Sequence, residues 1–178
     1  MCTIAIEPLT KAAFARFGEV IELAGAERIA INQGFAERVN GLARIDVGAD
    51  GGSVNISLFA AKARPCPIAI ELMERHPLGS QLFYPLQDRR WLVLVCDDPH
   101  DPRGYRAFAA TGRQGVNYRR NVWHHPLLVT ADDEQFLVVD RAGPGDNLEE
   151  ARLDPQHLLY LAPQESNTST TRTARARP

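Results

Sequence analysis

Short apolar segments separated by turn residues are the feature that most constrains the fold of this chain. Six segments have the length and composition of strands: residues 54–60, 82–86, 91–96, 105–110, 125–130 and 136–140. Glycine and proline residues interrupt regular structure between them, at Gly79, Pro85, Pro99, Pro102, Gly104, Gly112, Gly115, Pro126, Gly143 and Pro144. Many short strands with this spacing predict an antiparallel sandwich or barrel.

Helical signals are few. One short helix is expected at residues 10–17, because Thr10 can cap its first turn and Gly18 can end it. Residues 68–74 fit either a helix or a strand, and residues 154–160 fit either a final helical turn or a last strand. We therefore expect a mainly β protein with a few short helices.

The length of the chain, 178 residues with 44% hydrophobic and 24% charged side chains, is that of one globular domain with a real core. We assign that domain to residues 1–163. Residues 164–178 consist mostly of Ser, Thr, Arg and Ala without an apolar pattern, so we expect a disordered tail there.

Charge and cysteine usage exclude several classes of partner. The net charge of −2 does not favour nucleic acid or a membrane surface, and no apolar run approaches the roughly 20 residues that span a bilayer. Residues 1–7 lack the pattern of a signal peptide. Cys2, Cys66 and Cys96 form neither a disulfide framework nor a zinc pattern. We expect a reduced, cytoplasmic protein that acts on a small molecule.

Side chains that can carry chemistry concentrate in two segments. Residues 114–127 contain two adjacent arginines and the adjacent pair His124 and His125. Neighbouring residues of a strand point to opposite faces, so only one of these two histidines can face a barrel interior, and we choose His124. Glu74 and His76 are two residues apart, which puts both on one face of a strand, and Gln81 follows a turn.

The two segments together could line a pocket inside a barrel. Each also has a plainer interpretation. Residues 74–81 could be the end of a surface strand with a hydrogen-bonded histidine. Residues 114–127 could be a loop with solvated arginines and one packed His–Trp pair.

The order of these residues resembles the two-part metal motif of the cupin superfamily. Glu74 stands in the place of the first histidine, His76 in that of the second, and Gln81 in that of the glutamate. His124 stands in the place of the last histidine. Because an amide is a weaker ligand than a carboxylate, the site is altered, but Glu74, His76 and His124 could still hold a divalent ion. A metal-free site is equally compatible with the sequence.

Longer blocks resemble the ureidoglycolate lyase family. The most specific are Glu-Arg-His-Pro-Leu-Gly-Ser-Gln at residues 74–81 and Trp-His-His-Pro-Leu at residues 123–127. Further blocks lie at residues 31–34, 106–108, 115–118 and 139–141, so the resemblance runs from about residue 4 to residue 162. It implies a cupin-like β-barrel, a homodimer, and cleavage of (S)-ureidoglycolate to glyoxylate and urea in purine (allantoin) catabolism. It also implies a divalent metal, nickel in particular, and no organic cofactor.

Ureidoglycolate chemistry suggests roles for the residues in these blocks. A histidine, His124 or His76, can take the hydroxyl proton directly or with a bound metal, and Glu74 can orient it. An arginine suits the substrate carboxylate through its bidentate fork, and the candidates are Arg75, Arg120 and Arg141. Amides can orient the hydroxyl or urea group. Three further candidates for substrate binding are Gln81, Asn32 and Tyr118.

One departure from the family pattern is Ala60, where an arginine is frequent, and Lys62 and Arg64 are close enough in sequence to replace it. Three alternatives to the lyase remain open at this point. The first is a ureidoglycolate amidohydrolase that releases ammonia and carbon dioxide, although the chain lacks ligands for a two-metal site. The second is a cupin-type module that binds a small acid without turnover. The third, a sugar isomerase or epimerase, rests on analogy of fold alone.

Overall fold

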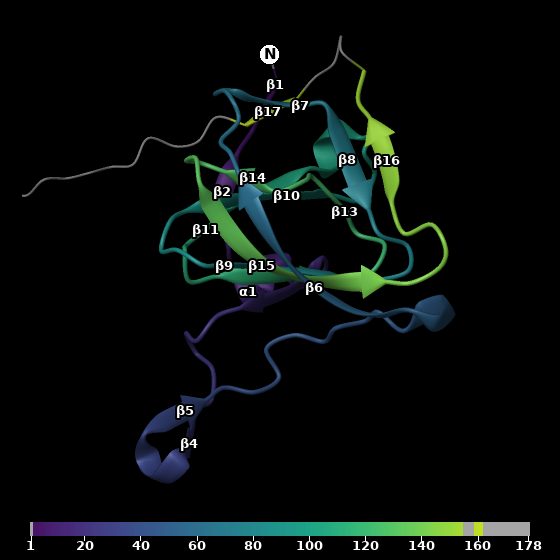
Figure 1. Ribbon diagram of the computed structural model, residues 1–178. Helices are drawn as coiled ribbons and strands as arrows, with labels where there is room; N and C mark the ends of the chain where they lie inside the picture. Colours follow the sequence, from purple (N-terminus) through teal and green to yellow (C-terminus); the bar gives the residue numbers. More distant parts are fainter. Residues whose placement is uncertain (1, 155–158, 162–178) are drawn as a thin grey trace, which may run out of the picture.

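The computed structural model describes residues 2–154 and 159–161, and the fold is mainly β with few short helical segments, as expected (Figure 1). Two larger sheets pack face to face, an arrangement consistent with a cupin-like sandwich. The five-stranded sheet has the order β3 (Gly18–Ile21), β12 (Gly115–Tyr118), β9 (Gln81–Pro85), β15 (Glu134–Ala142) and β6 (Ser53–Ala61). No helix in the described residues is long and apolar enough to cross a membrane.

The seven-stranded sheet has the order β16 (Glu149–Arg152), β8 (Leu72–Arg75), β13 (Trp123–His124), β10 (Trp91–Cys96), β11 (Arg106–Ala110) and β2 (Ile6–Pro8), and β14 (Leu128–Val129) also pairs with β10. A three-stranded sheet contains β1 (Cys2–Ile4), β17 (Leu159–Leu161) and β7 (Ile68–Ile70). A separate hairpin is formed by β4 (Ile29–Ile31) and β5 (Ala36–Arg38). The helical segments are α1 (Lys11–Phe14), η1 (Asn32–Gly34), η2 (Ala49–Gly51) and η3 (Pro102–Gly104).

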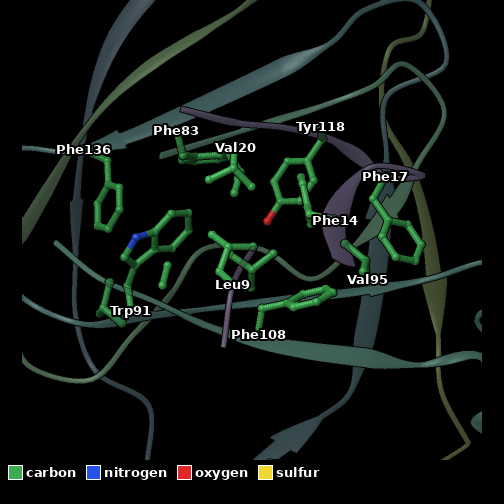
Figure 2. Close-up of a cluster of buried hydrophobic side chains, with 14 of the residues drawn as sticks. Leu9, Phe14, Phe17, Val20, Phe83, Trp91, Val95, Phe108, Tyr118 and Phe136 are labelled. Carbon is green, nitrogen blue, oxygen red and sulfur yellow. The ribbon is translucent and has the colours of Figure 1, made fainter. Parts of the chain in front are cut away.

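Strand β10 separates two apolar cores, because side chains alternate between the faces of a strand. Trp91, Val93 and Val95 point into the main core between the two larger sheets. Leu92, Leu94 and Cys96 point into a second core on the other side, which also contains residues of β7 and β8. In Figure 2 the main core is an aromatic cluster: Phe14, Phe108 and Tyr118 lie on one side, and Trp91 and Phe136 on the other. This core holds the two sheets at a fixed separation.

Several sequence predictions agree with the structure. Strand β10 has the expected bounds, β6 and β15 cover the expected segments, and Thr10 caps α1 by accepting a hydrogen bond from the Ala13 amide at 3.1 Å. The ambiguous residues 68–74 form two strands, β7 and β8, with Glu71 between them. Of residues 154–160, the end belongs to strand β17, whereas residues 155–158 lie outside the described residues. The tail predicted at residues 164–178 also lies outside them.

Other predictions were wrong in detail. The strand predicted at residues 125–130 is much shorter: β13 ends before it, at His124, and only Leu128–Val129 forms a strand, β14. Pro126 explains the break, because proline has no N–H to donate to a ladder. The sheets are also not purely antiparallel, since β1 pairs with β17 and β2 pairs with β11 in parallel. Gly115, counted among the residues that interrupt regular structure, instead begins strand β12, which pairs with both β3 and β9.

Candidate active site

Three side chains form the centre of the candidate site. One ligand atom from each of Glu74, His76 and His124 lies within 4.8 Å of the others. Strands β8 and β13 pair antiparallel with His124 opposite Glu74, which places these two side chains on the same face of the sheet. His76 follows two residues after Glu74 and shares that face. The sheet register therefore assembles a cluster from segments that are nearly fifty residues apart in the sequence.

Both histidines of the cluster are held by backbone carbonyl groups. His76 Nδ1 lies 2.6 Å from the Asn147 carbonyl oxygen, and His124 Nδ1 lies 2.9 Å from that of Val122. A carbonyl oxygen only accepts, so each Nδ1 donates, and in a neutral ring each Nε2 then carries a lone pair. His76 Nε2 is buried and has no hydrogen-bond partner among the described residues. In metal sites a carbonyl oxygen that accepts from one ring nitrogen of a histidine orients the other nitrogen towards the metal, and both histidines of the cluster have this arrangement.

The residues of the cluster fit a divalent metal ion. Two imidazole nitrogens and one carboxylate are a donor set that suits iron, nickel or zinc. His124 Nε2 lies 3.5 Å from Glu74 Oε1 and 3.1 Å from Gln81 Oε1. If the His124 ring is neutral, the Gln81 amide must turn its NH₂ group towards Nε2, because two acceptors cannot bond to each other. Gln81 thus lies beside the candidate ligand atoms, at the position of the cupin-like motif where an amide stands in place of a carboxylate.

Electrostatics keep the Glu74 carboxylate ionised. Burial raises the pKa of Glu74, but the hydrogen bond and charge of His124, with that of His76, outweigh burial and hold the pKa below its ordinary value. Tyr118 supports His124 from the other sheet: the two rings stack with centroids 4.2 Å apart and planes 12° apart. Burial raises the pKa of Tyr118 far above its ordinary value, so its hydroxyl stays protonated. Tyr118 therefore positions His124 as a neutral platform.

His125 points away from this cluster, as strand alternation predicts. Its side chain is buried and its Nδ1 lies 2.7 Å from the Pro126 carbonyl oxygen. Burial lowers the pKa of His125 to about 4, so its ring is neutral at pH 7.

The three candidate arginines each have a partner away from the cluster. Arg75 binds Glu149 and lies over the Trp123 ring, 4.5 Å from its centroid. Arg141 is buried and donates to the carbonyl oxygens of Ala49 and Pro144 at 2.8 and 2.7 Å. These contacts bind Arg141 to the surrounding loops.

Arg120 is the most available of the three. Its side chain is 44% exposed, and its Nε lies 3.4 Å from Asp46 Oδ2. It lines a pocket of about 540 Å³ together with Glu19, Arg44, Asp46, Ser80 and Arg119. The next residue along the chain, Asn121, donates its amide to the His76 carbonyl oxygen at 2.9 Å. Arg120 is therefore anchored one residue away from the cluster while its guanidinium faces the pocket.

Asn32 is not brought to the cluster within one chain. It lies in η1 at the tip of the β4–β5 hairpin, which stands clear of the barrel in Figure 1. Ala60, where the family pattern has an arginine, is an exposed residue of β6 opposite Gln135. Sequence reasoning missed Asn147, whose carbonyl orients His76 and whose side chain accepts from the Leu78 amide at 2.8 Å. Its one signal was a glycine- and proline-rich turn shortly before it.

Comparison with known proteins decides the family. A family model described as "Ureidoglycolate lyase" matches residues 1–159. The chain belongs to the ureidoglycolate lyase family. The resemblance seen in the sequence blocks is thus confirmed. Among relatives, "Ureidoglycolate lyase 1" of Rhizobium meliloti (strain 1021) is 53% identical over 157 residues, covering 88% of this chain and 92% of that protein.

A second relative is "Ureidoglycolate lyase" of Azotobacter vinelandii. It is 48% identical to this chain over 163 residues, covering 90% of this chain and 98% of the relative. Similarity to solved structures is more distant. A dTDP sugar isomerase from Desulfovibrio desulfuricans G20 matches with a TM-score of 0.38 and 19% identity, covering 74% of this chain and 84% of that one.

Proposed function

We propose that this protein is a ureidoglycolate lyase that cleaves (S)-ureidoglycolate to glyoxylate and urea in allantoin and purine catabolism. The observation that carries the proposal is the cluster of Glu74, His76 and His124, with both Nδ1 atoms bound to carbonyl groups and one ligand atom of each residue within 4.8 Å of the others. Family membership over residues 1–159 supports the choice of substrate. The free thiols Cys66 and Cys96 suit the reducing cytoplasm, where we place the reaction.

The proposed reaction is an elimination from one carbon. A base takes the proton of the hydroxyl group, the C–O bond becomes the carbonyl of glyoxylate, and the C–N bond breaks. The leaving urea nitrogen receives a proton, so atoms and charge balance without a redox cofactor. When no metal occupies the cluster, the base is the Nε2 lone pair of His124 or His76, and the ionised Glu74 carboxylate lies beside His124 Nε2 and would stabilise the protonated ring.

A divalent metal, nickel by resemblance to the family, would be held by Glu74, His76 and His124. When bound, it supplies a Lewis acid that polarises a substrate oxygen. The Gln81 amide is close enough to orient the hydroxyl or urea group. For the carboxylate we favour Arg120 over Arg75 and Arg141, because its side chain is the most exposed of the three and its ion pair is longer than that of Arg75.

The free edge of β6 also supports a homodimer. Strand β6 is the last strand of its sheet, and an unpaired edge invites a second copy of the chain.

A product assay tests the function. Purified protein is incubated with racemic ureidoglycolate, with and without chelator, and urea, glyoxylate and ammonia are quantified. Equal amounts of urea and glyoxylate are expected, and consumption of one enantiomer only. Ammonia in place of urea would instead indicate an amidohydrolase, and no product at all would contradict an enzymatic function on this substrate.

Two histidine variants connect the activity to the cluster. His124→Ala and His76→Ala should each lower kcat by about 10²–10⁴-fold, the usual contribution of a positioned acid or base. His100→Ala is the matched control, because His100 is exposed and outside the cluster. Full activity of both cluster variants, with folding verified by circular dichroism, would refute the assignment.

A further inference from the structure

A projecting hairpin has no support from the barrel of its own chain. We call residues 29–38 the arm: β4 and β5 pair with each other and, within the part of the chain that the structure describes, with no other strand, and they stand clear of the barrel in Figure 1. Phe35 at its tip is 90% exposed. An isolated two-stranded hairpin is at best marginally stable in water. The arm therefore needs a surface to pack against, and its own barrel does not provide one.

The tip of the arm is conformationally costly. Asn32, Gln33 and Gly34 have φ values of 52°, 60° and 90°, three consecutive residues in the left-handed region. For Asn32 and Gln33 this conformation is unfavourable, and such residues persist where surrounding structure holds them in place. The hydrogen bond of the Phe35 amide to the Asn32 carbonyl oxygen, at 3.1 Å, lies within the tip itself. A partner surface that packs against the tip would stabilise this shape.

A matching surface lies on the outer side of the five-stranded sheet. Val54, Ile56 and Leu58 alternate along β6 and are 55, 68 and 67% exposed. Their register partners on β15 are Arg141, Val139 and Leu137. Val139 and Leu137 are apolar, so they add a second strand to the apolar surface that begins on β6. Leu82 on β9, opposite Val139, extends it by a third. We call these residues (Val54, Ile56, Leu58, Leu82, Leu137 and Val139) the apolar face.

The apolar face and the pocket of Arg120 are linked through the start of β9. Ser80, which lines that pocket, directly precedes β9 and is two residues from Leu82. The chain returning from the arm also crosses this side, because the Arg44 carbonyl oxygen accepts from the Asn117 side chain on β12 at 3.0 Å. The outer side of the sheet thus has an apolar part over β6, β15 and β9, and a polar, arginine-containing part over the ends of β9 and β12.

We infer that the arm of a second copy of this chain packs on that outer side, with Phe35 on the apolar face and Asn32 and Gln33 at the pocket of Arg120. The arm matches this surface in composition. Phe35 is a large apolar side chain that suits the apolar face, and the amides of Asn32 and Gln33 suit the polar pocket. Glu37 of the arm pairs at 2.8 Å with Arg28, the residue just before the arm, so docking does not bury an unpaired charge from this pair. In a dimer with a two-fold axis, the arm of each chain would pack on the apolar face of the other, so the same contact would form twice.

The available area is sufficient for a stable dimer. A nine-residue strand is about 30 Å long and three strands are about 14 Å wide, so the apolar face alone offers about 400 Å². Each chain would bury its own apolar face and also the ten residues of its own arm. The two together approach the roughly 800 Å² per partner of a standard interface. The inference also rests on the proposed function in one respect: since Arg120 is the proposed carboxylate ligand, the substrate site is incomplete without the partner's Asn32 and Gln33.

Sedimentation of the full chain tests the docking surface without reference to activity. Wild-type protein should sediment as a dimer, and the double variant Ile56→Lys, Leu58→Lys as a folded monomer. Leu148→Lys is the matched control, because Leu148 is 55% exposed but lies outside the arm and the apolar face; it should remain dimeric. Phe35→Asp should also weaken the dimer. A monomeric wild type, or a double variant that stays dimeric, would overturn the inference.

Subunit mixing tests whether the tip acts on the partner's site. The variant Asn32→Ala, Gln33→Ala should lose about 10- to 100-fold in kcat/KM, as expected for lost hydrogen bonds to charged groups. His124→Ala should be inactive. A heterodimer of the two, purified through different tags, contains one site with an intact cluster and an intact partner arm, so it should recover about half of the wild-type activity. Recovery to no more than the level of the arm variant would show that each arm serves its own chain.

The failures of the two proposals are distinguishable. If wild-type protein does not cleave ureidoglycolate, the proposed function fails, and sedimentation of the wild type and the Ile56→Lys, Leu58→Lys variant still decides the interface. If the wild type is active as a monomer, or the tip variant keeps full activity as a dimer, the function stands and the role of the arm in the site is refuted.

Discussion

At the scale of single residues, Gln81 distinguishes this site from a cupin metal site with a full set of ligands. The end of its side-chain amide lies 3.1 Å from His124 Nε2, at the position where the cupin motif has a glutamate. Because a carboxylate is a better ligand than an amide, Gln81→Glu should bind nickel at least about tenfold more tightly, a gain of about 1.4 kcal/mol. The added negative charge should also raise KM for the anionic substrate.

Titration calorimetry with nickel and steady-state kinetics measure both effects of Gln81→Glu. Gln135→Glu is the control, because Gln135 is exposed on β15 and lies outside the cluster. Equal nickel affinity in the two variants would place Gln81 outside the coordination sphere.

Glu134 is a second residue whose charge state has a measurable consequence. It is fully buried, its Oε2 has no partner among the described residues, and burial raises its pKa above the ordinary value. A raised pKa in the folded state means that this residue favours folding fully below about pH 4.5 and that its contribution is lost as pH rises through the folded pKa. Glu134→Gln keeps the oxygen that accepts from the Ala131 amide and carries no charge.

We therefore expect Glu134→Gln to be more stable than wild type at pH 7–8, by about 1–3 kcal/mol. The difference should shrink as pH falls and vanish near pH 4. Urea unfolding across this pH range measures it. A constant difference at every pH would show that the carboxyl group does not titrate differently in the folded and unfolded states.

At the scale of elements, the pairing of β3 with β12 supports the site, because β12 ends at Tyr118, the residue that stacks on His124. A Cβ atom at Gly18 would lie 1.9 Å from the Asn117 carbonyl oxygen. Gly18→Ala should therefore destabilise the fold by about 1–3 kcal/mol, the usual cost of overpacking, and lower activity through Tyr118.

Gly48→Ala is the matched control for Gly18→Ala. A Cβ atom there meets nothing within 4 Å, and its φ of −81° suits alanine. That variant should be unchanged or gain about 0.4–1 kcal/mol. Urea unfolding compares the two, and equal stabilities would contradict the close approach of β3 and β12.

The elements also show how far the sequence can be interpreted. Strand β10 was predictable because six consecutive apolar residues buried on both faces leave no alternative of that length. The juxtaposition of Glu74 with His76 followed from the two-residue period of a strand. The absence of strand pairing around Pro126 could also have been predicted, because proline has no N–H to donate to a ladder. By contrast, Asn147 orients His76 across a separation of 71 residues, and no local pattern encodes such a contact.

At the scale of the whole molecule, the site connects the two large sheets. Glu74 belongs to β8, His76 to the turn after β8, and His124 to β13 of the seven-stranded sheet. Gln81 and Tyr118 belong to the five-stranded sheet. The segments that meet at the cluster are far apart in the sequence, so they come together only when the chain is folded. A metal bound there has no comparable site in the unfolded chain, so its binding free energy stabilises the entire fold.

Metal should accordingly raise the melting temperature of the protein. Nickel at 100 times its Kd adds about 2.7 kcal/mol, which corresponds to about 5–11 °C for a chain of this size. The shift should be reversed by chelator and absent in His76→Ala, while His100→Ala, an exposed histidine, keeps it. Differential scanning calorimetry of the three proteins, with and without nickel, measures the effect. An equal shift in His76→Ala would mean that the ion binds elsewhere, because the imidazole with the unpartnered Nε2 would then play no part in holding it.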